Sequence, residues 1–221
     1  MSAATEPPTS QLPFLDWAVA SRPIAGEERS GDIAIVRRTP TGCVLAVVDG
    51  LGHGPAAALA ADLVAEVVSD DPEASLEALF WRAHERLAET RGAAATIAVV
   101  DGHTGRLDWL GVGNVDGVVT RADEAARPRT IGVFLCRGVL GYRLPALHVP
   151  EPIKLVDGDS ILIATDGITG NLGDALLPPG VPAALLADRL LDERASREDD
   201  ALVFVAHYRV PTEGVEAAGD E

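Results

Sequence analysis

Acidic residues in this chain recur where apolar, strand-like runs begin or end. These positions are Asp32, Asp49, Asp166 and the neighbours Asp199 and Asp200. Neighbouring strands can bring such ends to one rim of a sheet, where the carboxylates repel one another unless cations or protons neutralise them. Carboxylate oxygens without a Cys/His cluster favour Mg²⁺ or Mn²⁺ over zinc. A single Asp-Gly pair indicates only a turn, but its recurrence at strand ends predicts a metal site.

The segment after Asp49 predicts a strand, a tight turn and a helix. Residues 43–48 form an apolar run typical of a buried strand. Gly50, Gly52 and Gly54 allow a sharp turn, because glycine adopts positive φ without a steric cost. Residues 55–68 then show apolar positions at helical spacing. Asp49 would lie at the end of a rigid strand, beside exposed backbone carbonyls; the alternative is that it caps local amides.

The order of the predicted elements indicates a layered α+β fold rather than a doubly wound one. Strands are expected over residues 15–20, 33–37, 43–48, 94–100, 106–112, 115–120, 160–165 and 201–208, with two or three weaker strands between 130 and 149. Helices are expected over residues 55–70, 72–90 and 181–194. Turn residues at 40–42 and 101–105 predict two hairpins.

Length, composition and charge limit the classes of protein to which the chain can belong. The 221 residues are 47% hydrophobic and 24% charged, which is typical of a globular protein with a sizeable core. We expect one domain over residues 12–210, between a polar tail at 1–11 and an acidic tail at 211–221. The formal net charge of −16 argues against binding to nucleic acid or to an anionic membrane surface.

The cellular compartment is predicted from the cysteines and from the signals that the sequence does not contain. Cys43 and Cys136 lie in apolar runs, which indicates core thiols in a reducing compartment rather than a disulfide framework. The N-terminus shows no basic segment followed by an apolar one, and no apolar run approaches the roughly 18 residues that span a bilayer. We therefore expect a cytoplasmic protein.

Six short motifs occur together in one order. They are Gly31-Asp32, Asp49-Gly50-Leu51-Gly52-His53-Gly54, Arg91-Gly92-Ala93-Ala94-Ala95-Thr96, Val112-Gly113-Asn114-Val115, Thr165-Asp166-Gly167-Ile168 and Ser196-Arg197-Glu198-Asp199-Asp200. In this combination the chain resembles the SpoIIE-type branch of the metal-dependent PPM (type 2C) serine/threonine phosphatases, over roughly residues 15–209. Within that branch the resemblance is greatest to a stand-alone phosphatase that resets the bacterial stressosome.

The resemblance implies a four-layer αββα sandwich of two antiparallel sheets, with two Mn²⁺ or Mg²⁺ ions at one edge. Asp49 would bridge both ions and the Gly50 carbonyl would complete one coordination sphere. Asp166 and Asp199 would hold the other ion, Asp32 would bind directly or through water, and Asp200 would be a secondary ligand. Asp49 and Asp166 would thereby hold the water that attacks phosphoserine or phosphothreonine.

The expected substrates, by resemblance, are phosphorylated STAS-domain proteins of a stressosome or partner-switching pathway. Three alternatives remain open: a phosphatase of an anti-anti-sigma factor, a catalytically inactive PPM-like binding module, and a calcium-binding structural protein, although no EF-hand loop is present. The oligomeric state is not predicted by the sequence.

Other polar residues have a structural and a chemical interpretation. His53 could donate to phosphate or act as an acid, but bracing of the glycine loop is the favoured role. For Asn114 a turn suffices as an explanation. Phosphatases of this fold often use an arginine upstream of the first acidic residue to bind phosphate; Arg22 and Arg29 lie upstream here, but neither has a matching spacing.

Overall fold

Two β-sheets form the centre of the computed structural model, which describes residues 12–175, 178 and 180–211. One sheet has the strand order β1-β11-β10-β6-β7, from β1 (Leu15–Arg22), β11 (Ala201–Tyr208), β10 (Ser160–Ala164), β6 (Asp116–Thr120) and β7 (Thr130–Gly132). The other has the order β2-β3-β4-β5-β8, from β2 (Asp32–Arg38), β3 (Gly42–Gly50), β4 (Ala93–Asp101), β5 (Arg106–Val112) and β8 (Leu135–Cys136), and β9 (Ile153–Lys154) pairs with β5.

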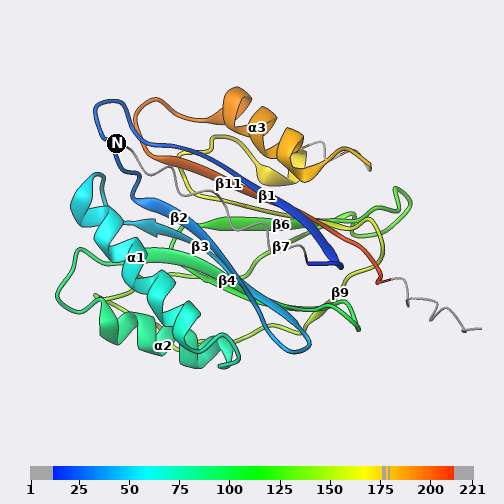
Figure 1. The fold of residues 1–221 in the computed structure, drawn as a ribbon, viewed down its shortest axis with the longest axis horizontal. Helices are drawn as coiled ribbons and strands as arrows, with labels where there is room; N and C mark the ends of the chain where they lie inside the picture. The colour runs from blue at the N-terminus through cyan, green and yellow to red at the C-terminus, as the bar shows by residue number, and fades with distance from the viewer. Residues whose placement is uncertain (1–11, 176–177, 179, 212–221) are drawn as a thin grey trace, which may run out of the picture.

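Helices cover the outer face of each sheet and complete four layers (Figure 1). Helices α1 (Pro55–Asp70) and α2 (Leu76–Arg86) lie on the β2–β3–β4 side, and α3 (Ala183–Arg194) packs on β1 and β11. A short 3₁₀ helix, η1 (Leu172–Asp174), lies against β6. The predicted αββα sandwich is confirmed.

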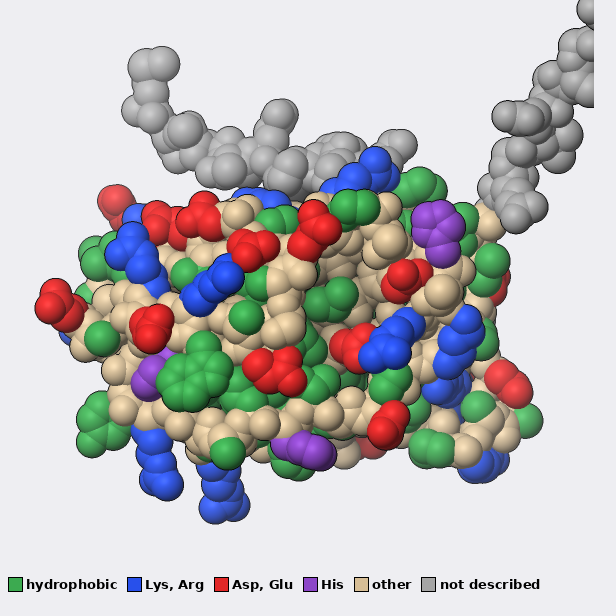
Figure 2. All heavy atoms as spheres, turned by 90° about the horizontal axis from the view of Figure 1, so that it is seen from below, with side chains coloured by type: hydrophobic (Ala, Val, Ile, Leu, Met, Phe, Trp, Pro, Cys, Tyr) green, Lys and Arg blue, Asp and Glu red, His purple; other side chains and the backbone are tan. Residues whose placement is uncertain are grey.

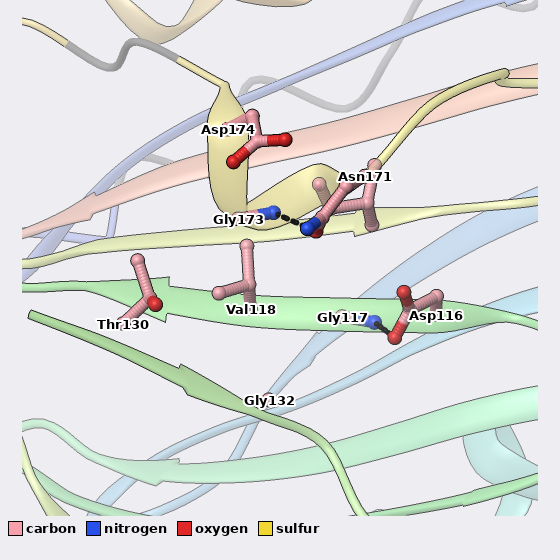
Figure 3. Close-up of a pocket in the computed structure, with 9 residues that line it drawn as sticks. Asp116, Gly117, Val118, Thr130, Gly132, Asn171, Gly173 and Asp174 are labelled. Carbon is pink, nitrogen blue, oxygen red and sulfur yellow. Dashed lines mark hydrogen bonds between the residues drawn. The ribbon is translucent and has the colours of Figure 1, made fainter. Parts of the chain in front are cut away.

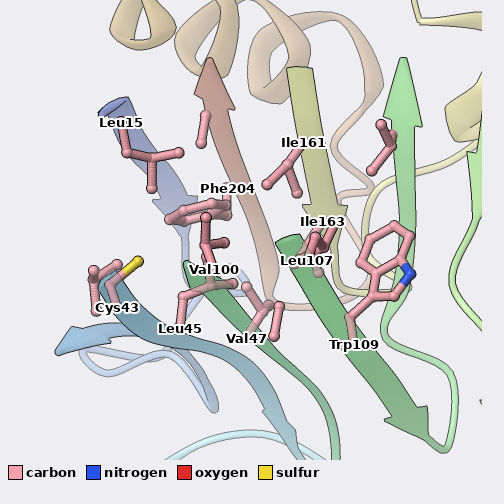
Figure 4. Packing of buried hydrophobic residues seen from close by; sticks show 14 of the residues in the cluster. Leu15, Cys43, Leu45, Val47, Val100, Leu107, Trp109, Ile161, Ile163 and Phe204 are labelled. Carbon is pink, nitrogen blue, oxygen red and sulfur yellow. The ribbon is translucent and has the colours of Figure 1, made fainter. Parts of the chain in front are cut away.

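The central strands are apolar throughout because both of their faces are buried. On β3, Leu45 and Val47 belong to the core between the sheets, whereas Val44 and Ala46 face α1 and α2. Figure 4 shows Leu45 and Val47 opposite residues of the other sheet such as Phe204. Alternation along a strand sets these faces, so each strand also determines on which side its terminal residues point.

Both predicted hairpins are present. β2 pairs antiparallel with β3, and β4 pairs antiparallel with β5.

The free thiols of Cys43 and Cys136 are buried, as their apolar surroundings predicted. Within the described residues, no helix has both the length and the apolar character that crossing a membrane requires.

The segment between β6 and β10 contains two short strands, as predicted, but one of their pairings is parallel. Only β7 and β8, of three and two residues, are strands between residues 130 and 149. β8 pairs with β5 in parallel, so this sheet is not purely antiparallel. Glycines at 138 and 141 and a proline at 145 interrupt regular pairing here.

Helix boundaries shift for local reasons. α2 begins after Ser75, whose hydroxyl accepts from the Ala78 N–H at 3.2 Å, and ends at Arg86 rather than at residue 90. α3 begins at Ala183, two residues later than expected, because Pro182 occupies the cap position in an extended conformation. The predicted tails at 1–11 and 211–221 lie outside the described residues, apart from Pro211.

The outer face of α1 and α2 mixes acidic, basic and hydrophobic side chains (Figure 2). Arg86 of α2 reaches Glu66 of α1 at 3.2 Å, and Arg82 pairs with Asp71 at 2.6 Å. These exposed ion pairs contribute little to stability, about 0–1 kcal/mol each. Burial of apolar side chains therefore holds the helices against the sheet.

Replacing Phe204 tests the core between the sheets. Phe204 is fully buried and its ring stacks on Trp17 with centroids 5.9 Å apart. Phe204→Ala should lower the free energy of unfolding by about 3–5 kcal/mol, measured by urea denaturation. The matched control is Leu185→Ala on α3, where the side chain is 62% exposed; it should change stability by less than about 0.5 kcal/mol. Equal effects of both substitutions would contradict this core.

Candidate metal centre

The first two carboxylates face each other across a hairpin. In the β2–β3 register, Asp32 lies directly opposite Asp49. Val36 of β2 and Val47 of β3 point into the core between the sheets, and alternation places Asp32 and Asp49 on the same face. Opposed residues in an antiparallel pair have Cα atoms about 4.5–5.5 Å apart. Two carboxylates therefore close one end of the inter-sheet core.

The second sheet reaches the same end through Thr165, which directly follows β10. The Thr165 hydroxyl donates to Asp32 Oδ2 at 2.7 Å, in a buried hydrogen bond that joins the two sheets. The same oxygen accepts from the Leu202 N–H of β11 at 2.9 Å. Thr165 thus links Asp32 to the start of β11, beside the acidic residues 199 and 200.

Asp200 holds the loop that precedes β2. Its Oδ1 accepts from the Ile24 N–H and its Oδ2 from the Gly31 N–H, both at 2.7 Å. The side chain is 3% exposed. Because backbone amides already occupy both oxygens, this geometry favours a positioning role for Asp200, next to Asp32, over a role as metal ligand.

The glycines that follow Asp49 and Asp166 let another backbone segment approach closely, because they have no side chain. A Cβ on Gly50 would lie 2.1 Å from the Ala57 carbonyl oxygen, and one on Gly167 would lie 1.9 Å from that of Asp200. Of the glycines predicted to need positive φ, Gly52 and Gly54 have it (84° and 74°), whereas Gly50 does not. Gly50 is required because α1 packs directly against the end of β3.

Asp166 is exposed, and Asn114 orients it. Asn114 lies in the turn between β5 and β6, and its Nδ2 donates to Asp166 Oδ2 at 2.6 Å. Sequence reasoning missed this role because a Gly-Asn turn already explained the residue. The available signal was its position: the turn follows a strand of the same sheet as β3, at the end where the acidic residues gather.

Burial and mutual repulsion raise the pKa values of the carboxylates. Burial, and then the negative charges of Asp32 and Asp166, raise the pKa of Asp49 to about 8. Burial also raises the pKa of Asp32 to about 7, against the opposing effect of the Thr165 hydrogen bond. The pKa of Asp166 is raised by burial and by Asp199. The charges of Asp166, Asp199 and Asp200 act on both Asp32 and Asp49, so the structure brings together the acidic positions that the sequence singled out.

The donor set suits a hard divalent cation. It offers carboxylate and backbone oxygens, the ligands that Mg²⁺ and Mn²⁺ prefer. In the described part of the chain, no three His, Cys, Asp or Glu side chains already converge into a closed ligand set. The carboxylates form an open rim instead, as like charges do without a counterion between them. Raised pKa values at two facing carboxylates, the buried Asp32 and the half-buried Asp49, are the observation that fits a cation here.

His53 lies on the outer side of the glycine loop. Its Nδ1 is 2.8 Å from Glu27 Oε1, and the imidazole is 58% exposed. The Glu27 carboxylate also occupies the space that a Cβ on Gly54 would fill. This contact agrees with the predicted bracing of the loop, and a direct role for His53 in the chemistry stays a prediction.

A cavity of about 220 Å³ opens over the face of β6 (Figure 3). It lies between β6, the short β7 and η1, and its walls include Asp116, Thr130, Asn171 and Asp174. Asn171 Oδ1 accepts from the Gly173 N–H at 2.8 Å, which shapes one wall. Polar side chains of β6, β7 and η1 therefore line this cavity.

The raised pKa values predict that the stability of the metal-free protein depends on pH. At pH 5–6 the folded protein holds protons on Asp32 and Asp49 that the unfolded chain, with ordinary pKa values near 3.8, has released. This contribution is complete below about pH 4 and is lost as pH rises through 7 to 8. In EDTA, urea midpoints of the wild type should fall relative to those of Asp49→Asn as pH rises from 5 to 8. A constant difference between the two proteins would contradict the raised pKa.

Removing the amide beside Asp166 should weaken cation binding. Asn114→Ala leaves Asp166 without its donor, and loss of such a supporting contact typically costs about 10–100-fold in metal affinity. Calorimetric titration with Mn²⁺ measures the change. The control is Asn171→Ala, which removes an amide from the neighbouring cavity wall and should leave Mn²⁺ affinity within about twofold. An unchanged affinity in Asn114→Ala would contradict the role of Asn114 in orienting Asp166 for cation binding.

Comparison with known proteins agrees with this architecture. The family model described as stage II sporulation protein E (SpoIIE) matches residues 39–209. Phosphoserine phosphatase RsbX of Bacillus subtilis (strain 168) is 25% identical over 178 residues, which cover 79% of this chain and 85% of RsbX.

Solved structures show the same fold. One from a study of the bacterial stressosome, as a modular system adapted to control secondary messenger signalling, is 30% identical with a TM-score of 0.78. The match covers 87% of this chain and 99% of that one. RsbX in complex with magnesium is 19% identical with a TM-score of 0.77, over 90% and 97% of the two chains. Because the SpoIIE model spans well over half of the sequence and the fold agrees, this chain belongs to the SpoIIE family of PP2C-type serine/threonine phosphatases.

Proposed function

We propose that this protein is an Mn²⁺- or Mg²⁺-dependent phosphatase that hydrolyses phosphoserine or phosphothreonine in a partner protein. One observation carries the proposal: Asp32 and Asp49 face each other at the end of the inter-sheet core, with pKa values raised by burial and by Asp166, Asp199 and Asp200. A site that crowds buried negative charge is stabilised by binding cations. A pure binding module has no physical need for that crowding.

The residues of the chain have distinct roles in this proposal. Asp49, with the Gly50 carbonyl, would lie between two cations; Asp166 and Asp199 would hold one of them from the other sheet. Asp32 would contribute directly or through water, fixed by Thr165. When bound, divalent cations supply charge neutralisation at the phosphoryl oxygens and lower the pKa of water.

The remaining contacts of the site hold its acidic residues and their loops in position. Asn114 holds Asp166 at one rotamer, and Asp200 fixes the loop around Gly31. Phosphoryl transfer requires little covalent participation from protein side chains, because placement and charge stabilisation dominate its catalysis. A rim of carboxylates that holds cations can therefore support this reaction without a nucleophilic side chain.

The proposed substrates are phosphorylated STAS-domain proteins of a stressosome or partner-switching pathway. Support comes from the similarity to phosphoserine phosphatase RsbX and from the 30% identity with a structure from a stressosome study. A phosphatase of the RsbU type, acting on an anti-anti-sigma factor, is the alternative within the same chemistry.

Asp49→Asn tests the function. Phosphate release from a phosphoserine STAS-domain protein should require Mn²⁺ or Mg²⁺ and fall at least about 100-fold in the variant, since one carboxylate charge is worth several kcal/mol to cation-assisted transfer. Asp70→Asn, the same change at an exposed position on α1, is the control and should retain wild-type activity. Folded wild-type protein that binds Mn²⁺ without releasing phosphate would instead support the inactive binding module.

A further inference from the structure

A guanidinium group lies against the glycine loop of the metal centre. Arg91 lies in the connection between α2 and β4, and the next residue accepts a hydrogen bond from this loop: the Leu51 N–H donates to the Gly92 carbonyl at 3.0 Å. A Cβ atom on Gly52 would lie only 2.9 Å from Arg91 Nη1. Gly52 thus leaves the space that the guanidinium occupies, three residues after Asp49.

The backbone that carries Arg91 is fixed on both sides. The Gly92 N–H donates to the Thr90 hydroxyl at 3.0 Å, and the Ala93 N–H donates to the Leu140 carbonyl at 3.1 Å. Gly92 itself has a positive φ of 87°. A fixed backbone limits the region that the side chain can reach to the vicinity of the glycine loop, at the rim of the centre.

Arg91 has no partner for its charge within the described residues, where no carboxylate or carbonyl accepts a hydrogen bond from it. The arginines expected upstream are occupied. Arg29 pairs with Asp62 at 2.8 Å, and Arg22 donates to the carbonyls of Ala195 and Ser196 at 3.2 and 2.8 Å. The guanidinium of Arg91, which lies against the loop that follows Asp49, is thus unpaired and exposed, although the chain carries a net charge of −16.

A phosphomonoester needs such a group. The dianion must approach a rim of carboxylates, and cations at that rim offset only part of the repulsion. A guanidinium can donate two parallel hydrogen bonds to two phosphoryl oxygens, which fixes orientation as well as charge. Free donors at the edge of the centre are what a bound phosphoryl group requires.

We infer that Arg91 is the residue that binds the phosphoryl group of the substrate, with Gly52 providing the space for its guanidinium. This inference rests on the proposed phosphatase function. It assigns substrate binding to the α2–β4 connection rather than to an arginine upstream of Asp32. The recognised chemistry is the phosphate monoester itself, independent of the protein that carries it.

Steady-state kinetics on a small aryl phosphate test the assignment. Arg91→Ala should raise KM roughly tenfold to a hundredfold, and the inhibition constant of inorganic phosphate by a similar factor, because charge-assisted hydrogen bonds are lost. Arg91→Lys should recover only part of the loss, since an ammonium cannot form the paired contact. The control is Arg86→Ala, which removes an equal charge from the exposed pair with Glu66 and should match the wild type.

Two outcomes would overturn the inference. The first is a KM and a phosphate inhibition constant in Arg91→Ala within twofold of the wild-type values. The second is a calorimetric loss of Mn²⁺ affinity in that variant, which would show that Arg91 only shapes the metal loop.

Direct binding separates this inference from the proposed function. Calorimetry with inorganic phosphate, in the presence of Mg²⁺, measures the anion site even if the wild type shows no hydrolysis. Phosphate binding by the wild type that is lost in Arg91→Ala supports the assignment. Equal binding by both proteins, or none by the wild type, contradicts it.

Discussion

Electrostatic repulsion among carboxylates at one end of the inter-sheet core is the constraint on which the site depends. Strands β2 and β3 fix Asp32 and Asp49 opposite each other by backbone register, so neither side chain can move far away. Residues 165–167 and 199–200 approach from the other sheet and add further negative charge. The fold holds these groups together at an energetic cost, and bound cations or protons reduce that cost.

Two features keep the strained arrangement in place. Every central strand is buried on both faces, so packing of Val, Ile, Leu and Ala side chains stabilises the registers that position the acids. Glycines at 50 and 167 then let a helix and a second strand approach the site to within backbone contact. The polar groups of the site consequently lie on packed strands or in the turns directly beside them, which favours a fixed geometry.

Local patterns were sufficient to predict much of this arrangement. Asp32 and Asp49 follow from a hairpin signal combined with strand alternation, and the αββα layers follow from the order of the elements together with the family resemblance. Asn114 and Arg91 required the structure, because each acts on a residue about 40 or more positions away through tertiary contacts. The two short strands between residues 130 and 149 were predicted, but the parallel pairing of β8 with β5 was not, because contacts with neighbouring strands rather than local periodicity decide that pairing.

The hydrogen bond from Thr165 to Asp32 has a consequence for biosynthesis. Thr165 is held by Leu202 of β11, and β11 lies in the interior of its sheet, between β1 and β10. A ribosome must therefore have released the chain beyond residue 208 before the two sheets can close around the acidic rim. Until then a nascent chain presents Asp32 and Asp49 on an unsupported hairpin, so the acidic rim is complete only with the last strand.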